Sequence, residues 1–125
     1  MYRYSNEAAF SKAVCRHLRS KGYFVQRIES GSTGRGIPDI FTITPTGIPM
    51  WVELKRVHGK CRRCAIPWRE GQQVWLLEVS VRYKMQCVTL VAFDDCICCI
   101  SHNQYHHDNV VDCQKYPCIR AIQDL

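Results

Sequence analysis

The pattern of apolar and polar positions begins with a helix. Apolar residues recur three or four positions apart near the start of the chain: Ala9, Phe10, Ala13, Val14 and Leu18. This spacing places them on one face of a helix, because an α-helix turns once in about 3.6 residues. Ser5 or Asn6 can cap the start of the helix, and Gly22 is well placed to end it.

The segments that follow have the composition of strands. Residues 23–28, 40–44, 50–55 and 85–93 are rich in β-branched and aromatic side chains, and residues 96–101 are a weaker candidate. A Pro-Thr-Gly turn joins the second and third of these segments into a hairpin.

A second helix is expected between the hairpin and the fourth strand. Helical spacing runs over residues 68–79, after an irregular basic linker over residues 58–67. Trp75, Leu76 and Leu77 are expected to be core residues of this helix. The order helix, three strands, helix, strands predicts a single α/β domain with a mixed central β-sheet flanked by helices.

Length and composition indicate one ordinary globular domain. The chain has 125 residues, of which 46% are hydrophobic and 22% charged, so it can bury a core without disulfides or a metal. No apolar run approaches the ~18 residues of a membrane span. Residues 1–7 also lack the apolar segment of a secretory signal. We therefore expect an intracellular protein with no membrane partner.

The net charge of +6 comes from one segment of the chain. Residues 55–69 contain no acidic side chain and six basic ones: Lys55, Arg56, Lys60, Arg62, Arg63 and Arg69. Such a concentration is typical of a site for a polyanion, because each phosphate that a basic side chain neutralises releases counterions. The alternative is a solvated surface loop.

Cysteines and histidines raise the question of a metal. An odd number of cysteines, nine, without a signal peptide favours thiols in a reducing compartment over disulfides. The pair Cys61 and Cys64 has the spacing of half a zinc site, so a structural Zn²⁺ there competes with ordinary thiols. His102, His106 and His107 have no convincing ligand spacing and are expected in a loop.

Three charged residues mark one end of the hairpin. Asp39 directly precedes its first strand, and Glu53 and Lys55 lie near the end of its second strand. Side chains alternate along a strand, so Glu53 and Lys55 share a face, and pairing brings Asp39 beside Glu53. Two carboxylates suit Mg²⁺, which prefers oxygen ligands, and the backbone carbonyl of Leu54 can add another. The alternative is an ion pair between Glu53 and Lys55, with Asp39 an ordinary loop residue.

These residues resemble the motif of a known nuclease superfamily. Gly36-Ile-Pro38-Asp39, Glu53-Leu54-Lys55 and Gln72-x-x-Trp75 are similar to PD-(D/E)xK nucleases, and more narrowly to small stand-alone VRR-NUC domains of bacteriophages. The resemblance implies a single restriction-endonuclease-like domain over residues 1–125, with a motif-bearing core at about 5–93 and an extension at 94–125. The chain lacks the short glycine-containing turn that the family carries after the second helix.

The resemblance also implies roles for five residues. Asp39 and Glu53 would coordinate Mg²⁺, for which Mn²⁺ can substitute, and Lys55 would orient the attacking water or stabilise negative charge. Glu7 would reach the metal through water; the alternative is an acid placed favourably at a helix N-terminus. Gln72 would approach the metal-bound water or the scissile phosphate; the alternative is a polar residue on the helix surface.

Basic and aromatic residues complete the expected site. Arg35 lies between two glycines, which let a phosphate approach closely. The other candidate DNA contacts are Arg56, Lys60, Arg62, Arg63 and Arg69. Trp68 either stacks on a base or packs in the core.

The expected activity is Mg²⁺-dependent hydrolysis of phosphodiester bonds in DNA. The resemblance implies a structure-specific enzyme such as a Holliday junction resolvase, and symmetric cutting of two strands requires two copies of the site, hence a homodimer on branched DNA. Two alternatives remain: a zinc-held nucleic-acid-binding module without hydrolytic activity, and a restriction-type or RNA-cleaving nuclease.

Overall fold

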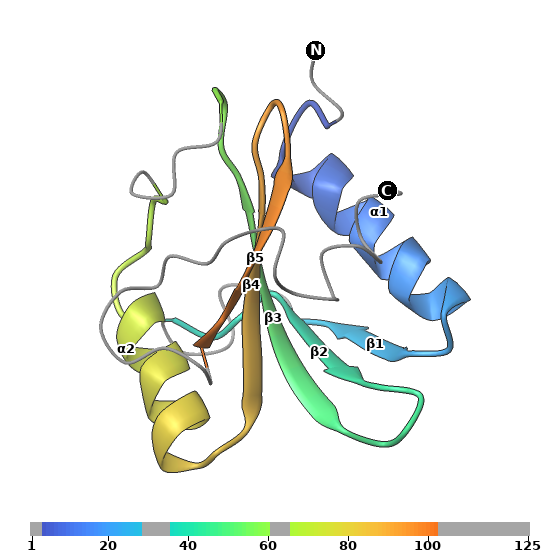
Figure 1. The fold of residues 1–125 in the computed structure, drawn as a ribbon, viewed down its shortest axis with the longest axis vertical. Coiled ribbons are helices and arrows are strands. Elements are labelled where there is room, and N and C mark those ends of the chain that lie inside the picture. The colour runs from blue at the N-terminus through green and yellow to red at the C-terminus, as the bar shows by residue number, and fades with distance from the viewer. Residues whose placement is uncertain (1–3, 29–35, 61–65, 103–125) are drawn as a thin grey trace.

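Five strands form one mixed sheet in the computed structural model, which describes residues 4–28, 36–60 and 66–102. The strands are β1 (Phe24–Arg27), β2 (Ile40–Ile43), β3 (Pro49–Arg56), β4 (Gln86–Ala92) and β5 (Ile97–Ser101). They lie in sequence order across the sheet, and neighbours are antiparallel except for β3 and β4, which are parallel. Figure 1 shows this sheet with one helix on each side. The α/β class and the mixed sheet are as predicted.

Helix α1 (Glu7–Ser20) begins and ends as the sequence predicts. The side chain of Asn6 accepts a hydrogen bond of 2.8 Å from the backbone N–H of Ala9, which satisfies one of the free donors at the start of a helix. Gly22 follows the helix with a φ of 88°, a left-handed conformation that favours glycine. Phe10, Val14 and Leu18 are buried against the sheet, on the face that α1 covers.

The second helix is shorter than predicted. Helix α2 covers Gln72–Leu77 and continues as a π-helical segment, Glu78–Arg82. Gly71 precedes α2 with a φ of 84°, a conformation that an α-helix does not contain, so Trp68 lies in the connecting chain instead of the helix. Leu76 is fully buried as expected, but Leu77 is 39% exposed and is not a core residue.

The turn after the π-helical segment contains a lysine in a backbone conformation that usually favours glycine. Lys84 has a φ of 56°, the left-handed conformation that a glycine would adopt without steric cost. The chain therefore passes from Tyr83 into β4 through a turn that contains no glycine.

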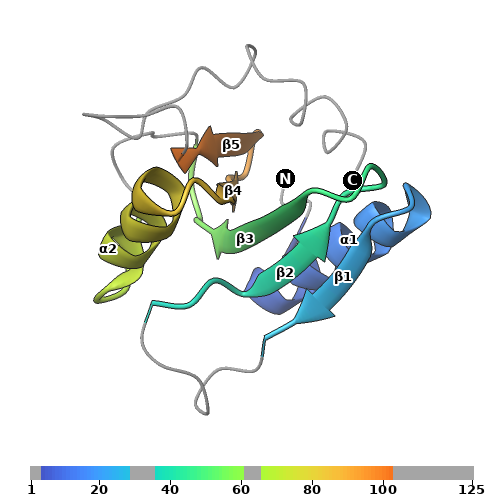
Figure 2. The ribbon, with the colours of Figure 1, turned by 90° about the horizontal axis from the view of Figure 1, so that it is seen from below.

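Strand β3 is central to both the core and the site. Every residue from Val52 to Lys55 is buried. Val52 and Leu54 belong to the core cluster that packs against α1, whereas Glu53 and Lys55 face the opposite side and contact α2. Figure 2 shows β3 between the two helices. The predicted alternation along this strand is confirmed.

The sheet continues beyond the motif-bearing core that was expected to end near residue 93. Strand β5 pairs with β4 and all five of its residues are buried. A smaller apolar cluster of Val91, Phe93, Cys98 and Ile100 lies under Trp68. No helix among the described residues is long and apolar enough to cross a membrane.

Candidate active site

The carboxylates of Asp39 and Glu53 lie side by side at the end of the hairpin where β2 begins. Ile40 pairs with Val52, so Asp39 lies beside Glu53, as the hairpin register predicts. The Oδ2 atom of Asp39 accepts a hydrogen bond of 2.9 Å from the backbone N–H of Leu54. This bond extends the pairing of the two strands by one side chain and fixes the Asp39 carboxylate against β3.

The carboxyl group of Glu53 is buried, and its charge is only partly compensated. Burial and the neighbouring Asp39 carboxylate raise the pKa of Glu53 from 4.5 to about 7, and the opposing effect of Lys55 is smaller. Its Oε2 lies 3.1 Å from the ammonium nitrogen of Lys55. Its Oε1 is buried and has no hydrogen-bond partner within the part of the chain that the structure describes.

Gln72 connects the charged residues to α2. Its Oε1 accepts a hydrogen bond of 2.6 Å from Lys55 Nζ, and its Nε2 donates one of 2.6 Å to Glu53 Oε2. The same Oε1 accepts the backbone N–H of Arg69 at 2.9 Å. Gln72 is 1% exposed, so the alternative of a surface polar residue is wrong; Gln73, which is exposed, is the surface residue.

Glu7 approaches the same place from α1. Glu7, Asp39, Leu54 and Arg69 line a cleft of about 840 Å³ beside the carboxylates. Partial burial and the charge of Asp39 raise the pKa of Glu7 above 4.5, whereas Lys55 and Arg69 oppose the shift. The side chain therefore interacts electrostatically with the site as well as lying at a helix N-terminus.

Two glycines hold the loop before Asp39 against the start of α2. Gly36 has a φ of 83°, and a Cβ atom at this position would lie 2.6 Å from the carbonyl oxygen of Gly71. Only glycine permits so close an approach of two backbone segments. The contact aligns the segment that carries Asp39 with the helix that carries Gln72.

Asp39 and Glu53 bring two carboxylates together, and the metal ligands expected for Mg²⁺ include both. Hard divalent cations prefer carboxylate and carbonyl oxygens, and the unpartnered Oε1 of Glu53 beside Asp39 fits such an ion. A cation there would compensate the charge that burial leaves uncompensated on Glu53. The described segments contain no group of three or more His, Cys, Asp or Glu side chains arranged for a metal, so two carboxylates and a backbone carbonyl are the donor set to test.

The predicted DNA contacts have different surroundings. The guanidinium of Arg69 is 60% exposed and lies 3.7 Å from Asp39 Oδ1 and 3.8 Å from Glu53 Oε2. Lys60 is exposed. Arg35, Arg62 and Arg63 lie outside the described residues, as do Cys61, Cys64, His106 and His107.

Arg56 is a correction to the expected DNA contacts. Its side chain is 2% exposed, and its Nη2 donates a hydrogen bond of 2.7 Å to Asp94 Oδ1. Its other nitrogens donate to the backbone carbonyls of Tyr4, Val57 and Ala92. A buried guanidinium with these partners joins β3, β4 and the N-terminal segment, and we do not retain it as a phosphate contact.

Several residues near the site were not predicted to lie there. His102, expected in a loop, is 1% exposed, and burial lowers its pKa to about 4. It bonds to Thr89, which lies opposite Glu53 in the register of β3 and β4, and that register is the signal that points to Thr89. Arg19 and Arg27 line the cleft beside Asp39, although both lie outside the basic segment.

The described cysteines are thiols on α1, on β4 and β5, and directly before β5. Cys15, Cys87, Cys98 and Cys99 are buried, and Cys96 is half-buried. Burial raises the pKa of the Cys87 thiol to about 12. These thiols behave as small apolar side chains in the core.

The five-stranded mixed sheet with flanking helices defines a restriction-endonuclease-like fold. A solved structure with this fold is Hjc, a Holliday junction resolvase from the archaeal hyperthermophile Archaeoglobus fulgidus. Its TM-score is 0.57 at 14% sequence identity, over 89% of this chain and 92% of that chain. No protein-family model matches the chain, and no curated protein matches its sequence. The likeness to Hjc establishes the fold, and the chemistry must be argued from the residues.

Proposed function

We propose that this chain is a Mg²⁺-dependent endonuclease that hydrolyses phosphodiester bonds in DNA. The observation that carries the proposal is the buried group of Glu53, Lys55 and Gln72 beside Asp39. A buried carboxylate with an unpartnered oxygen is costly to a folded protein, so its presence next to a second carboxylate favours a functional role.

The proposed roles follow the positions of the side chains. Asp39, Glu53 and the carbonyl of Leu54 would hold the ion, with Glu7 acting through water from α1. When bound, Mg²⁺ supplies an activated water and compensates charge on the phosphoryl group. Lys55 places an ammonium next to the Glu53 carboxylate, where it can stabilise the negative charge that develops as the phosphodiester is attacked.

The finer assignment to branched DNA rests on two supports. The fold is shared with Hjc, a Holliday junction resolvase, over most of both chains. The motif residues resemble VRR-NUC domains of small phage proteins. A resolvase cuts two strands symmetrically, so we propose a homodimer with one site per protomer, acting inside the cell.

A cleavage panel tests the activity and its specificity together. The protein is incubated with Mg²⁺ or Mn²⁺ and labelled four-way junction, flap, linear duplex, single-stranded DNA and RNA. We expect preferential and symmetric cutting of the junction. Equal cutting of linear duplex would exclude junction specificity and favour a restriction-type enzyme, and preferential cutting of RNA would overturn the DNA assignment.

Matched variants test the site. Asp39→Asn, Glu53→Gln and Lys55→Met should each lower the cleavage rate by at least about 100-fold. The controls Glu78→Gln and Lys12→Met remove the same charges from exposed positions and should leave the rate unchanged. Wild-type-like cleavage by the site variants would show that the site is misassigned. Stoichiometric zinc without any cleavage would instead support the zinc-held binding module.

A further inference from the structure

Trp68 packs against the ammonium group of Lys55. The Lys55 Nζ atom lies 5.7 Å from the centroid of the Trp68 ring, within the range of a cation–π interaction. Glu53 and Gln72 contact the same ammonium at 3.1 and 2.6 Å. The Lys55 ammonium therefore has an aromatic ring beside it in addition to its two polar partners.

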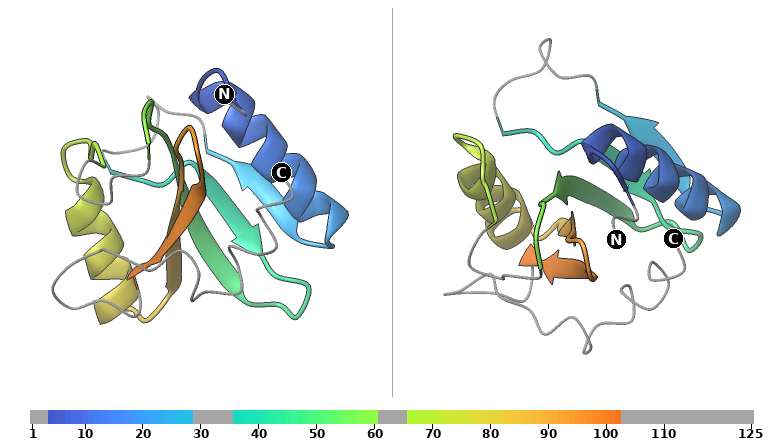
Figure 3. Two further views of the ribbon diagram at one scale, coloured as in Figure 1. Left: turned by 45° about the horizontal axis from the view of Figure 1, so that its top comes forward. Right: turned by 90° about the horizontal axis from the view of Figure 1, so that it is seen from above.

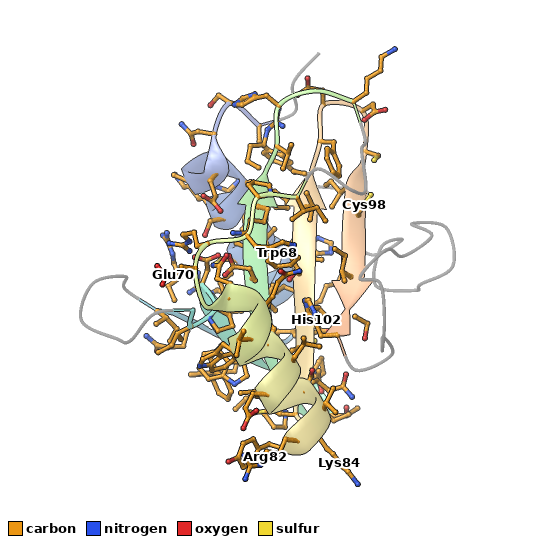
Figure 4. The ribbon with its side chains drawn as sticks, turned by 90° about the vertical axis from the view of Figure 1, so that its left-hand side faces the viewer. Trp68, Glu70, Arg82, Lys84, Cys98 and His102 are labelled. Atoms are coloured by element: carbon orange, nitrogen blue, oxygen red, sulfur yellow. The ribbon has the colours of Figure 1, made fainter. Side chains whose placement is uncertain are left out.

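Trp68 also contacts His102, which is itself held by hydrogen bonds. The ring of Trp68 meets the ring of His102 edge to face, with centroids 5.9 Å apart. His102 in turn bonds through Nε2 to the hydroxyl of Thr89 at 2.8 Å, and its carbonyl accepts the hydroxyl of Ser80 at 3.5 Å. Figure 4, viewed from the α2 side, shows Trp68 and His102 close to α2.

These contacts form a continuous line of packed side chains from β4 to the proposed active site. The line runs through Thr89, His102, Trp68 and Lys55. His102 and Lys55 are almost completely buried, at 1% and 5% exposure. Because burial keeps His102 neutral near pH 7, the residue supports Trp68 without adding a second positive charge near the ammonium.

We infer that Trp68 is a positioning residue that holds the Lys55 ammonium in its place beside Glu53, and that His102 and Thr89 hold Trp68. The inference rests on the proposed function for the role of Lys55. A lysine side chain has four rotatable bonds, and its hydrogen bond to Gln72 and ion pair with Glu53 leave its orientation incompletely determined. The ring face adds an attraction of its own and excludes water from that side of the ammonium.

The alternative for Trp68 is stacking on a DNA base. The two roles affect different steps, because base stacking contributes to DNA affinity, whereas the positioning of Lys55 contributes to the rate of cleavage after binding. Affinity and rate are therefore measured separately on a four-way junction. Affinity is measured in Ca²⁺, and the cleavage rate under single turnover in Mg²⁺.

Trp68→Leu removes the aromatic face, and Trp68→Phe retains it. We expect Trp68→Leu to cut about tenfold more slowly, with junction affinity within about twofold of wild type, and Trp68→Phe to stay within about twofold in both. Trp75→Leu is the matched control, because the ring of Trp75 packs edge to face against the ring of Trp51. Its cleavage rate per folded protein should be that of wild type.

A spectroscopic measurement does not depend on activity. Protons on the Lys55 side chain next to the ammonium should show a ring-current shift in the NMR spectrum of the wild type. The shift should be lost in Trp68→Leu and kept in Trp75→Leu. Thr89→Val removes the hydroxyl that anchors His102 with little change of shape; it should weaken the shift and slow cleavage about threefold, which keeps the inference testable should Trp68→Leu not fold.

The outcomes separate the inference from the proposed function. Unchanged Lys55 signals in both Trp68→Leu and Thr89→Val overturn the inference whatever the wild type cuts. A loss of affinity in Trp68→Leu with an unchanged cleavage rate overturns it in favour of base stacking. A wild type that cuts no substrate overturns the proposed function, and the effect of Trp68 on cleavage with it; the NMR shift still tests whether Trp68 positions Lys55.

Discussion

At the scale of single residues, the buried carboxyl group of Glu53 lowers the stability of the fold but suits a residue that binds a cation. Its carboxyl group is fully buried, shares its surroundings with Asp39, and has one oxygen without a partner among the described residues. Folding therefore places a charge where it is poorly solvated. The position makes sense for a residue whose charge is compensated by a bound cation.

The raised pKa of Glu53 predicts how stability depends on pH. The folded protein binds the Glu53 proton more tightly than the unfolded chain does, so without divalent cations the stability falls as pH rises from about 4.5 to about 7. Glu53→Gln removes this dependence and should raise the stability relative to wild type above about pH 7. Urea unfolding in a chelator measures it; Glu78→Gln is the control, and parallel pH curves for wild type and Glu53→Gln would contradict the assignment.

Gln72 is a second residue that we expect to contribute both to the stability of the fold and to cleavage. Gln72→Leu removes its bonds to Lys55, Glu53 and the backbone of Arg69. We expect a loss of stability of about 1–3 kcal/mol and cleavage about ten- to hundredfold slower. Denaturant unfolding and single-turnover cleavage measure the two effects.

The adjacent Gln73 is a control for the same substitution. Gln73 is exposed, so Gln73→Leu should change neither quantity. An equal loss of cleavage in Gln73→Leu and Gln72→Leu would mean that the helix surface, not the buried amide, matters.

The sequence predicts which charged residues form the site better than it predicts the side chains that surround them. Asp39, Glu53 and Lys55 lie together because strand alternation and hairpin register are local rules. Gln72 joins them from α2, and only the family resemblance pointed to it. Arg56 was misassigned because burial of a charged residue depends on distant partners, here Asp94 and three backbone carbonyls. His102 was missed for the same reason, since its partner Thr89 is reached only through tertiary contact.

At the scale of elements, two connecting segments determine how the site is assembled. The loop before β2 and the start of α2 touch through Gly36 and Gly71, which both have positive φ angles. The sequence predicted a flexible loop but not what it contacts. The start of α2 was predicted too early for a related reason, because the left-handed conformation of Gly71 is set by this packing.

The contact between these segments predicts a sharp difference between two glycines. Gly36→Ala places a Cβ 2.6 Å from the Gly71 oxygen, whereas Gly47→Ala, at a φ of 91°, meets nothing within 4 Å. Gly47→Ala should cost about 1–2 kcal/mol for its backbone conformation alone. Gly36→Ala should cost more and also slow cleavage, because α2 must shift. Unfolding and cleavage rates of the pair measure this, and equal effects would show that the close approach does not matter.

At the scale of the whole molecule, the basic side chains fall into two groups: some are buried in ion pairs and some are exposed to solvent. Arg56 is inside, paired with Asp94, whereas Lys60 and Arg69 are exposed. Partial burial acts to raise the pKa of Asp94. The hydrogen bonds from Arg56 and Gly59 nevertheless hold this pKa below its ordinary value. Figure 3 shows that α1 runs alongside β1. Arg19 of α1 and Arg27 of β1 both line the cleft beside Asp39.

Arg56 and Lys60 should respond to substitution in opposite ways. Arg56→Met breaks a buried pair and should destabilise the protein by about 3 kcal/mol without changing the DNA affinity of the folded protein. Lys60→Met should weaken DNA binding and leave stability unchanged. Thermal unfolding and fluorescence anisotropy with labelled DNA measure both. A loss of affinity in folded Arg56→Met would restore its role as a DNA contact.

The cleft beside Asp39 predicts a salt-dependent contact from Arg27. This residue lies opposite Ile40 in the sheet, one position from Ile28, whose N–H donates to the carbonyl of Asp39. If a phosphate binds there, Arg27→Gln should reduce the slope of log affinity against log salt by about 0.9. Arg16→Gln, on the other side of α1, is the control. Identical slopes for the two variants would exclude the contact.

The parallel pairing of β3 with β4 also bears on when activity arises as the chain folds. Asp39, Glu53 and Lys55 belong to one hairpin, whose short turn closes at small entropic cost. Gln72 reaches them only after α2 has crossed over and β4 has paired with β3, and such non-local parallel pairing forms slowly. We expect the acidic residues to come together early and the lysine to be ordered late. In refolding, catalytic competence should therefore lag behind the appearance of secondary structure.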